Sequence, residues 1–367
     1  MGKKIISSAV AVTLSISAFF GLQRLLMPKY MSRPFEGALT QEYYADAHAN
    51  SLLILGDCEV YENISPLPLW EEYGIPSYIR GNAKQLMWQT YAMLEDALRY
   101  ETPKAVLLSV LGMIYREPQP DSEPYNRMAL DGLRLSRTKL EAARASILPQ
   151  EEFWSYLFPL LRFHSRWSEL TREDLRYYFT SARRQVSISG FVMRSDAKAA
   201  GWIPDPPLLP RYEFSAMAYD YLDKIRNLCQ AKGIQLLLFK APSLAPYWYP
   251  EWEQQIVEYA HKHGLPYLNA LEKTGEIGLD FAADTYDMGL HLNRQGAEKM
   301  SRYLTPWLRQ NCPALEDQRG DAGLSAAWAV KTAQYRAMQA AQEREIAEDG
   351  AVKTFFVPEI AHIEMVN

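Results

Sequence analysis

The side chain best suited to covalent chemistry in this sequence is the thiol of Cys58. An apolar run, residues 52–55, ends abruptly in Gly56-Asp57, and Cys58 follows directly. A buried strand followed by a tight turn places the next side chain at the carboxyl end of a sheet, where open α/β folds carry their sites. An acyl-cysteine is a thioester that can pass its acyl group onward. The pattern indicates acyl transfer, with the alternative that Cys58 is a small core residue.

A second block supplies a base. His291 opens the sequence His291-Leu292-Asn293, just ahead of a predicted helix over residues 295–304. Acyl transfer needs a group that takes the proton of the nucleophile and a further group that orients this base. Asp287 is the first candidate for the orienting carboxylate, and Asp284 is the fallback.

These two blocks resemble the SGNH/GDSL hydrolase superfamily, with Cys58 where the family has its serine. The resemblance covers roughly residues 50–310. It implies that Cys58 is the nucleophile, His291 the base and Asp287 the orienting group. The family spaces the last pair as Asp-x-x-His, whereas this chain has one extra residue. Gly289 can absorb that residue in a bulge.

The resemblance also implies donors for an oxyanion, which are the backbone N–H groups of Cys58 and Gly81. Gly81 matches the glycine block of the family at the end of the second strand. The asparagine block that the family has after its third strand is missing, and Asn82 or Asn126 are the candidates to replace it. Each missing donor costs roughly 10²–10³ in rate.

The residues beside Cys58 act against its ionisation. A neighbouring imidazole favours a thiolate, but the carboxylates of Asp57 and Glu59 disfavour it. The sequence therefore leaves two hypotheses open, a working cysteine nucleophile and a site that has lost its activity.

Composition excludes several classes of protein. The chain has 367 residues, of which 48% are hydrophobic and 23% charged, so it can bury a full core and is not disordered throughout. Its net charge of -5 argues against a general nucleic-acid binder. No zinc-ribbon or nucleotide-loop motif occurs, so neither a metal nor another cofactor is expected. With three cysteines, a disulfide between Cys229 and Cys312 would leave Cys58 free.

The N-terminus carries a targeting segment. Lys3 and Lys4 precede the apolar run 5–22, which as a helix is about 27 Å long and close to the thickness of a bilayer core. We expect a membrane anchor over residues 1–27 and a juxtamembrane linker over 28–48. The alternative is a cleaved signal peptide with its cleavage site near residues 15–17. The family resemblance implies that the body of the protein lies outside the membrane.

Apolar runs and helical patterns alternate through the body, residues 49–312. The predicted strands cover residues 51–55, 77–79, 105–110, 234–239 and 265–268, and the predicted helices between them cover 84–100, 212–231 and 252–263. This alternation predicts parallel pairing and helices on both faces of the sheet. The expected fold is a flavodoxin-like three-layer α/β sandwich with about five strands.

Two segments do not follow this alternation of strands and helices. An insertion over about residues 114–210 is either a cap over the site or a structural excursion with helices of its own. Within it, Arg166 and Trp167 could bind a sugar or could fasten the insertion to the core. The tail, residues 313–367, contains a predicted helix over 326–348 that docks on the domain or on a partner helix.

The anchor, the insertion and the closing block look most like the surface branch of SGNH proteins, which acts in lipoteichoic-acid D-alanylation and exopolysaccharide O-acetylation. This resemblance implies an acyltransferase or esterase for O-acetyl groups of a cell-surface polysaccharide, with a membrane-bound O-acyltransferase as partner. The alternative is a non-catalytic member that binds glycan or scaffolds such a complex.

Overall fold

A five-stranded parallel sheet forms the centre of the protein, in the order β2-β1-β3-β4-β5. The computed structural model describes residues 2–27, 39–118, 122–179, 185–200 and 205–358. The strands are β1 (Leu52–Gly56), β2 (Ser77–Gly81), β3 (Ala105–Ser109), β4 (Gln235–Lys240) and β5 (Tyr267–Asn269). In register, Leu52 pairs with Ser77 on one side and Ala105 on the other. The predicted fold class is confirmed, since this strand order is that of flavodoxin-like sheets.

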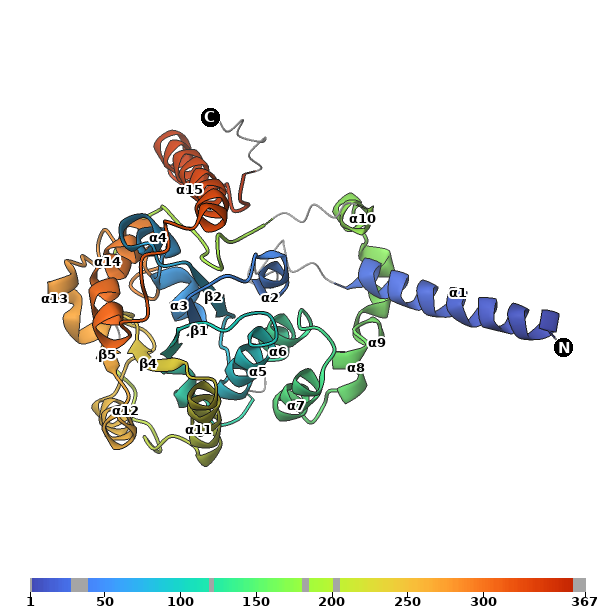
Figure 1. Cartoon of the computed structure of the whole chain (residues 1–367), viewed down its shortest axis with the longest axis horizontal. Coiled ribbons are helices and arrows are strands. Elements are labelled where there is room, and N and C mark those ends of the chain that lie inside the picture. Colours follow the sequence, from blue (N-terminus) through green and yellow to red (C-terminus); the bar gives the residue numbers. More distant parts are fainter. Residues whose placement is uncertain (1, 28–38, 119–121, 180–184, 201–204, 359–367) are drawn as a thin grey trace.

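Both faces of the sheet are covered, which explains why its strands read as unbroken apolar runs. Alternate residues of β1 point to opposite sides: Leu52 and Ile54 into one core cluster, Leu53 and Leu55 into the other. The first face is covered by α3 (Cys58–Asn63), α4 (Pro66–Tyr73), α14 (Arg294–Asn311) and α15 (Ala322–Asp349), and the second by α5 (Met87–Ala97), α11 (Ala216–Ala231) and α12 (Pro250–His263). Figure 1 shows the two layers of helices on either side of the strands.

The predicted linker is shorter than expected. Residues 39–45 form α2 (Leu39–Glu42) and the 3-10 turn η2 (Tyr43–Ala45), and the ring of Tyr43 is completely buried. The carboxylate of Glu42 accepts hydrogen bonds from the backbone N–H groups of Val186 and Ser187. Residues 39–45 therefore belong to the body. The sequence 28–38, also predicted as linker, lies outside the described residues.

The insertion has helices of its own. It contains η3 (Leu111–Ile114), α6 (Glu123–Leu130), α7 (Arg137–Ser146), α8 (Phe153–Leu157), α9 (Leu160–Phe163), η4 (His164–Glu169) and α10 (Arg172–Phe179). The first of these helices pack on α5, where Ala92 and Met93 share a third core cluster with Ala129 and Ala143. The last of them, α9, η4 and α10, contact α1 instead. Of the two interpretations, the structural one describes this part of the insertion.

The C-terminal helix α15 docks on the domain. Trp328 stacks on Trp70 of α4, with ring centroids 5.2 Å apart and an angle of 13° between the rings. Tyr335 is fully buried, and its hydroxyl group bonds to Ser65 and to Glu298. The buried face of this helix consists of Trp328, Tyr335, Met338 and Gln342. The short elements η5 (Ala270–Lys273) and α13 (Thr274–Ile277) complete the domain.

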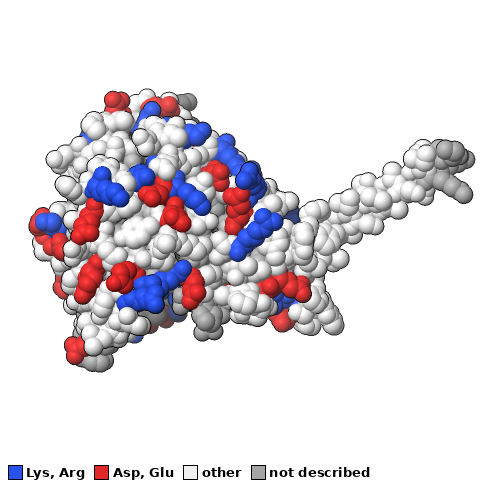
Figure 2. Space-filling model, turned by 90° about the horizontal axis from the view of Figure 1, so that it is seen from below, with Lys and Arg blue, Asp and Glu red and all other residues white. Residues whose placement is uncertain are grey.

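The N-terminal helix α1 (Gly2–Leu26) projects from the body. Its segment Ile5–Leu26 has a mean hydropathy of 2.0 and is long and apolar enough to cross a membrane. In Figure 2 it is a nearly uncharged rod, whereas the body carries interspersed positive and negative side chains. The helix is consistent with a signal anchor or with a signal sequence.

Candidate active site

Cys58 is the first residue of α3, directly after β1. The strand ends at Gly56, where β3 is too close for a side chain: a Cβ on Gly56 would lie 2.6 Å from the Cβ of Ser109. Asp57 then caps the helix, since its Oδ1 accepts a hydrogen bond of 3.1 Å from the backbone N–H of Glu59. This tight turn holds the half-buried thiol of Cys58 at the carboxyl end of the sheet.

The imidazole of His291 is near enough to the thiol of Cys58 to act on its pKa, and it is hydrogen-bonded to Asp287. Oδ2 of Asp287 lies 2.6 Å from Nδ1 of His291, and Oδ1 of the same carboxylate accepts a 2.7 Å bond from the backbone N–H of His291. Because Nδ1 is used by carboxylate, Nε2 is the nitrogen that remains for Cys58. The structure thus brings together the three residues that the sequence analysis grouped as nucleophile, base and orienting group.

The extra residue between Asp287 and His291 is accommodated in the backbone. Met288 and Gly289 both have left-handed conformations, with φ of 66° and 91°. A Cβ on Gly289 would lie only 2.7 Å from Cδ1 of Leu244, whose N–H donates to the carbonyl oxygen of Gly289. Two consecutive left-handed residues fold the segment back, so Asp287 reaches the ring of His291 despite the longer spacing.

The loop before α14 is fixed from both sides. Asn293 caps α14, and its side chain accepts a 3.1 Å bond from the N–H of Gly296. On the other side, Oδ1 of Asn63 accepts a 2.7 Å bond from the N–H of Leu292, and its Nδ2 donates to Ser243. Helix α3 therefore supplies Cys58 and also a side chain that holds the loop of His291 in place.

A second carboxylate, which the sequence analysis did not identify, reaches the same imidazole. Oε2 of Glu62 lies 3.0 Å from Nδ1 of His291, and Oε1 accepts a hydrogen bond from the hydroxyl group of Tyr286. Glu62 lies four residues after Cys58 on α3, so the two side chains share one face of that helix. That i, i+4 spacing was the available signal in the sequence.

The surroundings of Cys58 and His291 raise the pKa of both groups. Burial lowers the pKa of His291, but the charge of Glu62 and the hydrogen bond that the ring donates to Asp287 outweigh it and raise this pKa well above its usual value. Burial and the charge of Asp57 raise the pKa of the Cys58 thiol to about 12, although His291 acts to lower it. At neutral pH these shifts favour a neutral thiol facing a protonated imidazole.

A buried ion pair lies beneath the nucleophile turn. Nζ of Lys240 lies 2.7 Å from Oε1 of Glu59, and both side chains are almost fully buried. Burial and the charge of Glu59 raise the pKa of Asp57 to about 7. One oxygen of Asp57 and one of Glu59 have no hydrogen-bond partner within the described part of the chain. Tyr115, after β3, is near enough for the charges of Asp57 and Glu59 to raise its pKa.

The predicted oxyanion donors lie at the same strand ends. A Cβ on Gly81 would lie 2.9 Å from the carbonyl oxygen of Asp57, so the end of β2 touches the nucleophile turn. The N–H of Cys58 is in the first turn of α3, where amide groups have no acceptor within the helix. Asn82 is buried and donates to Thr40 and Gln85.

Two other candidates lie elsewhere. Asn126 is buried in a network with Gln89, Ser122 and Ser146. Asp284 accepts from Lys299 and from the N–H of Asp280, and no described contact joins it to His291.

Arg166 and Trp167 are not beside Cys58. Nη1 of Arg166 donates to the carbonyl oxygen of Leu26 at the end of α1, and its Nη2 pairs with Asp174. Trp167 is 72% exposed. Figure 1 shows this segment beside α1 and well separated from α3, so the described structure gives a sugar site at Cys58 no contribution from these two residues.

The predicted disulfide is wrong. Cys229 and Cys312 are free thiols, because they belong to core clusters on opposite faces of the sheet. Within the described residues, no group of three or more His, Cys, Asp or Glu side chains is arranged to hold a metal ion.

Two solved structures are similar to the chain. One is a protein from Bacteroides fragilis described as an acylhydrolase, with 10% identity and a TM-score of 0.37 over 74% of this chain and 94% of that one. The other is a GDSL-like lipase from Bacteroides thetaiotaomicron, with 9% identity and a TM-score of 0.37 over 75% of this chain and 97% of that one. No protein-family model and no curated protein sequence matches the chain. The likeness is distant, and the function proposed below rests on the geometry of the site.

Proposed function

We propose that this protein transfers or hydrolyses acyl groups through a thioester on Cys58, with His291 as base and Asp287 as the group that orients it. The observation that carries the proposal is the grouping of Cys58, His291 and Asp287 at the carboxyl end of β1, with His291 acting on the thiol of Cys58 and bonded to Asp287. A nucleophile, a base and an oriented imidazole within hydrogen-bond reach are the requirements for acyl transfer.

In the first half of the reaction, the neutral form of His291, which is populated above its raised pKa, takes the thiol proton as the sulfur of Cys58 attacks the acyl carbon. The N–H groups of Cys58 and Gly81 stabilise the resulting oxyanion. As the intermediate collapses, His291 returns the proton to the leaving oxygen and the acyl group remains on sulfur. In the second half, His291 deprotonates water or an acceptor hydroxyl, which attacks the thioester. The thiol of Cys58 is then regenerated.

The setting of this reaction comes from the resemblance and from α1. We propose that α1 anchors the protein in the membrane and that the body acts outside it on O-acetyl groups of a cell-surface polysaccharide, beside a membrane-bound O-acyltransferase. Support for a retained anchor comes from its contacts: the ring of Phe19 packs on Phe158 and the carbonyl of Leu26 accepts from Arg166.

One observation favours a second candidate, a non-catalytic protein that binds glycan or scaffolds an acyltransferase complex. Carboxylates surround Cys58, and its pKa is raised to about 12. A thiol with such a high pKa is a poor nucleophile at neutral pH unless His291 removes its proton during the attack.

The rate at which iodoacetamide alkylates Cys58 distinguishes the two candidates. In the full chain, we would measure this rate against pH together with turnover of p-nitrophenyl acetate, with Cys58→Ser and His291→Ala as comparison variants. Alkylation and ester turnover that depend on both residues support the enzyme. An inert thiol, with ester turnover equal to that of both variants, would leave the binding or scaffolding protein as the remaining candidate.

A further inference from the structure

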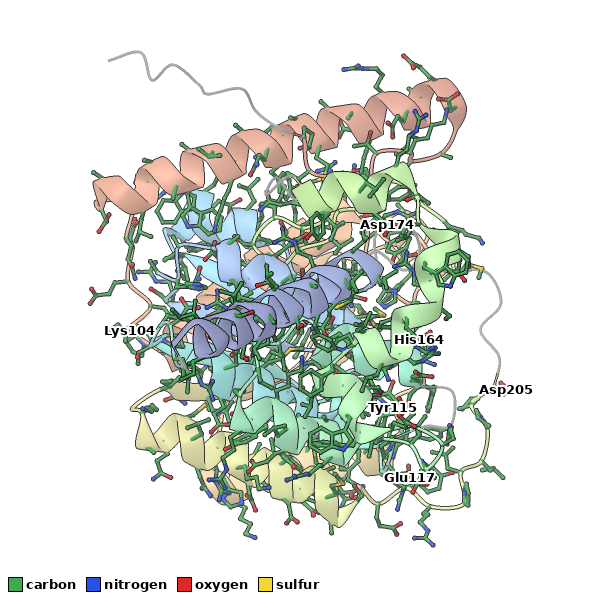
Figure 3. The ribbon with its side chains drawn as sticks, turned by 90° about the vertical axis from the view of Figure 1, so that its right-hand side faces the viewer. Lys104, Tyr115, Glu117, His164, Asp174 and Asp205 are labelled. Atoms are coloured by element: carbon green, nitrogen blue, oxygen red, sulfur yellow. The ribbon has the colours of Figure 1, made fainter. Side chains whose placement is uncertain are left out.

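The segment from α8 to α10, residues 153–179, has an unusual composition and an unusual neighbour. Nine of its 27 residues are Phe, Trp or Tyr, against 12% in the whole chain. Its helices α9 and α10 and the turn η4 contact α1. Figure 3 shows this green segment, with His164 and Asp174 labelled, alongside the blue helix that runs toward the viewer. We call residues 153–179 the aromatic segment.

The aromatic segment packs on the last two turns of α1. The rings of Phe158 and Phe19 meet edge to face with centroids 5.8 Å apart. A Cβ on Gly21 would lie 3.0 Å from the hydroxyl oxygen of Tyr178, so the glycine permits a close approach. At the end of the helix, Nη1 of Arg166 donates a 2.6 Å hydrogen bond to the carbonyl oxygen of Leu26.

These contacts set a depth for the aromatic segment. The first charged residue after the apolar run of α1 is Arg24, and Phe19 precedes it by five residues, or about 7.5 Å of helix. When α1 spans a bilayer, Phe19 therefore lies below the level of the headgroups. Because Phe158 touches Phe19, part of the aromatic segment lies at that level too.

The outward side chains of the aromatic segment suit such a position. Trp154, Leu161, Trp167 and Leu175 are large and apolar and are 61%, 46%, 72% and 47% exposed. Tryptophan is enriched at membrane–water interfaces, and short amphipathic helices bury an apolar face roughly 5–10 Å into that region. In water these exposed side chains would carry an unfavourable hydration free energy that lipid removes.

We propose that the aromatic segment lies in the interface of the same lipid leaflet from which α1 emerges, so that the body rests on the bilayer as well as being anchored to it. The proposal rests on the membrane anchoring given under the proposed function. The lipid surface is the occupant because α1 leaves the body through this part of the molecule. Arg166 is then a residue that joins the anchor to the aromatic segment.

Lipid photo-crosslinking tests the proposal with the full chain in phosphatidylcholine–phosphatidylglycerol nanodiscs that contain a diazirine acyl-chain lipid. We expect adducts on peptides of α1 and on peptides from residues 153–169. The peptide of α12 that carries Val257, which is 47% exposed, should have none. Adducts on α1 alone would overturn the interface proposal and leave the anchor intact. A chain that stays outside the nanodiscs, without adducts on α1, would overturn both.

Quenching by brominated lipids gives a second readout that does not depend on peptide recovery. The lipid-dependent quenching of tryptophan fluorescence should be lost when Trp154→Phe and Trp167→Phe are combined. Trp307→Phe, on α14, is the matched control and should leave the quenching unchanged. Equal quenching in the wild type and the double variant would refute the proposal, since phenylalanine preserves the packing in both cases.

Discussion

Glu62→Gln tests whether the second carboxylate sets the protonation of His291. In the folded protein, Oε2 of Glu62 lies 3.0 Å from Nδ1 of His291, and the Glu62 side chain is only 7% exposed. With an effective dielectric constant of 20, two unit charges at this distance attract each other by roughly 5 kcal/mol before desolvation is subtracted. Opposite charges this close shift a pKa by roughly 1–3 units, or about 1.4–4 kcal/mol.

The sign of the effect follows from the direction of the shift. Glu62 raises the pKa of His291, so its neutral form, which can act as base, is present only above that raised pKa. Removing the charge lowers this pKa. It also removes one of the charges that raise the pKa of Cys58. Both changes move the rising limb of the alkylation profile to lower pH.

The assay is a pH titration of the histidine ring carbons by NMR, with His291→Ala to assign the signal, in parallel with iodoacetamide alkylation of Cys58. Glu72→Gln is the control, because Glu72 is a partly exposed carboxylate that pairs with Arg302. A His291 pKa in Glu62→Gln within a few tenths of a unit of the wild-type value, or above it, would refute the electrostatic reasoning.

Three further substitutions address the turn around Cys58. In the wild type, the pKa of the buried Asp57 carboxyl is raised to about 7, so its ionisation destabilises the fold as pH rises from about 4 to 7. Asp57→Asn removes this ionisation and keeps an acceptor for the helix cap. We expect the variant to gain thermal stability over the wild type at pH 8.5 and little at pH 4; an equal change at both values would contradict this. Lys240→Met leaves the carboxylate of Glu59 buried without its cation and should lower the free energy of unfolding, measured by urea titration, by roughly 3–5 kcal/mol. Adding Glu59→Gln should restore part of this free energy, a recovery that a loss of packing alone would not give. Gly81→Ala places a methyl group 2.9 Å from the carbonyl oxygen of Asp57, and it should lower the free energy of unfolding by roughly 1–3 kcal/mol and reduce ester turnover. The control Gly275→Ala, whose methyl group would have no atom within 4 Å, should change neither quantity.

The strands of this fold could be predicted from sequence because each is short, apolar on both faces and bounded by a turn signal. The predicted strand 105–110 corresponds to β3 (Ala105–Ser109), which follows Pro103. The pattern around β4 (Gln235–Lys240) shifted the prediction by one residue because Ile234, although apolar and buried, precedes the strand. Local composition was sufficient for the sheet, since a buried parallel strand is nearly uniform along its length.

The site was predictable only where its residues lie close together in sequence. Asp287 and His291 could be grouped from one block, and Cys58 from the turn that precedes it. Glu62 was missed because its partner His291 is more than 200 residues away, and the pairing depends on how α3 faces the loop before α14. The pairing of Lys240 with Glu59 likewise joins the end of β4 to the first turn of α3, 181 residues apart in sequence. Arg166 and Trp167 were predicted to bind a sugar or to fasten the insertion to the core, whereas Nη1 of Arg166 donates to the carbonyl oxygen of Leu26, 140 residues away, which local composition does not reveal.

The docking of α15 determines when the hydrophobic core can close during synthesis of the chain. Tyr335 and Met338 belong to the same buried cluster as Leu52 and Ile54 of the first strand, and Lys331 forms an ion pair with Asp46. The polypeptide is synthesised from its N-terminus, so the side chains of α15 that close this core are made after all five strands. Until then, Trp70 lacks the ring of Trp328 that stacks on it. The first face of the sheet is therefore sealed only after α15 has been made, and a chain that stops before residue 322 would leave part of that face open to aggregation.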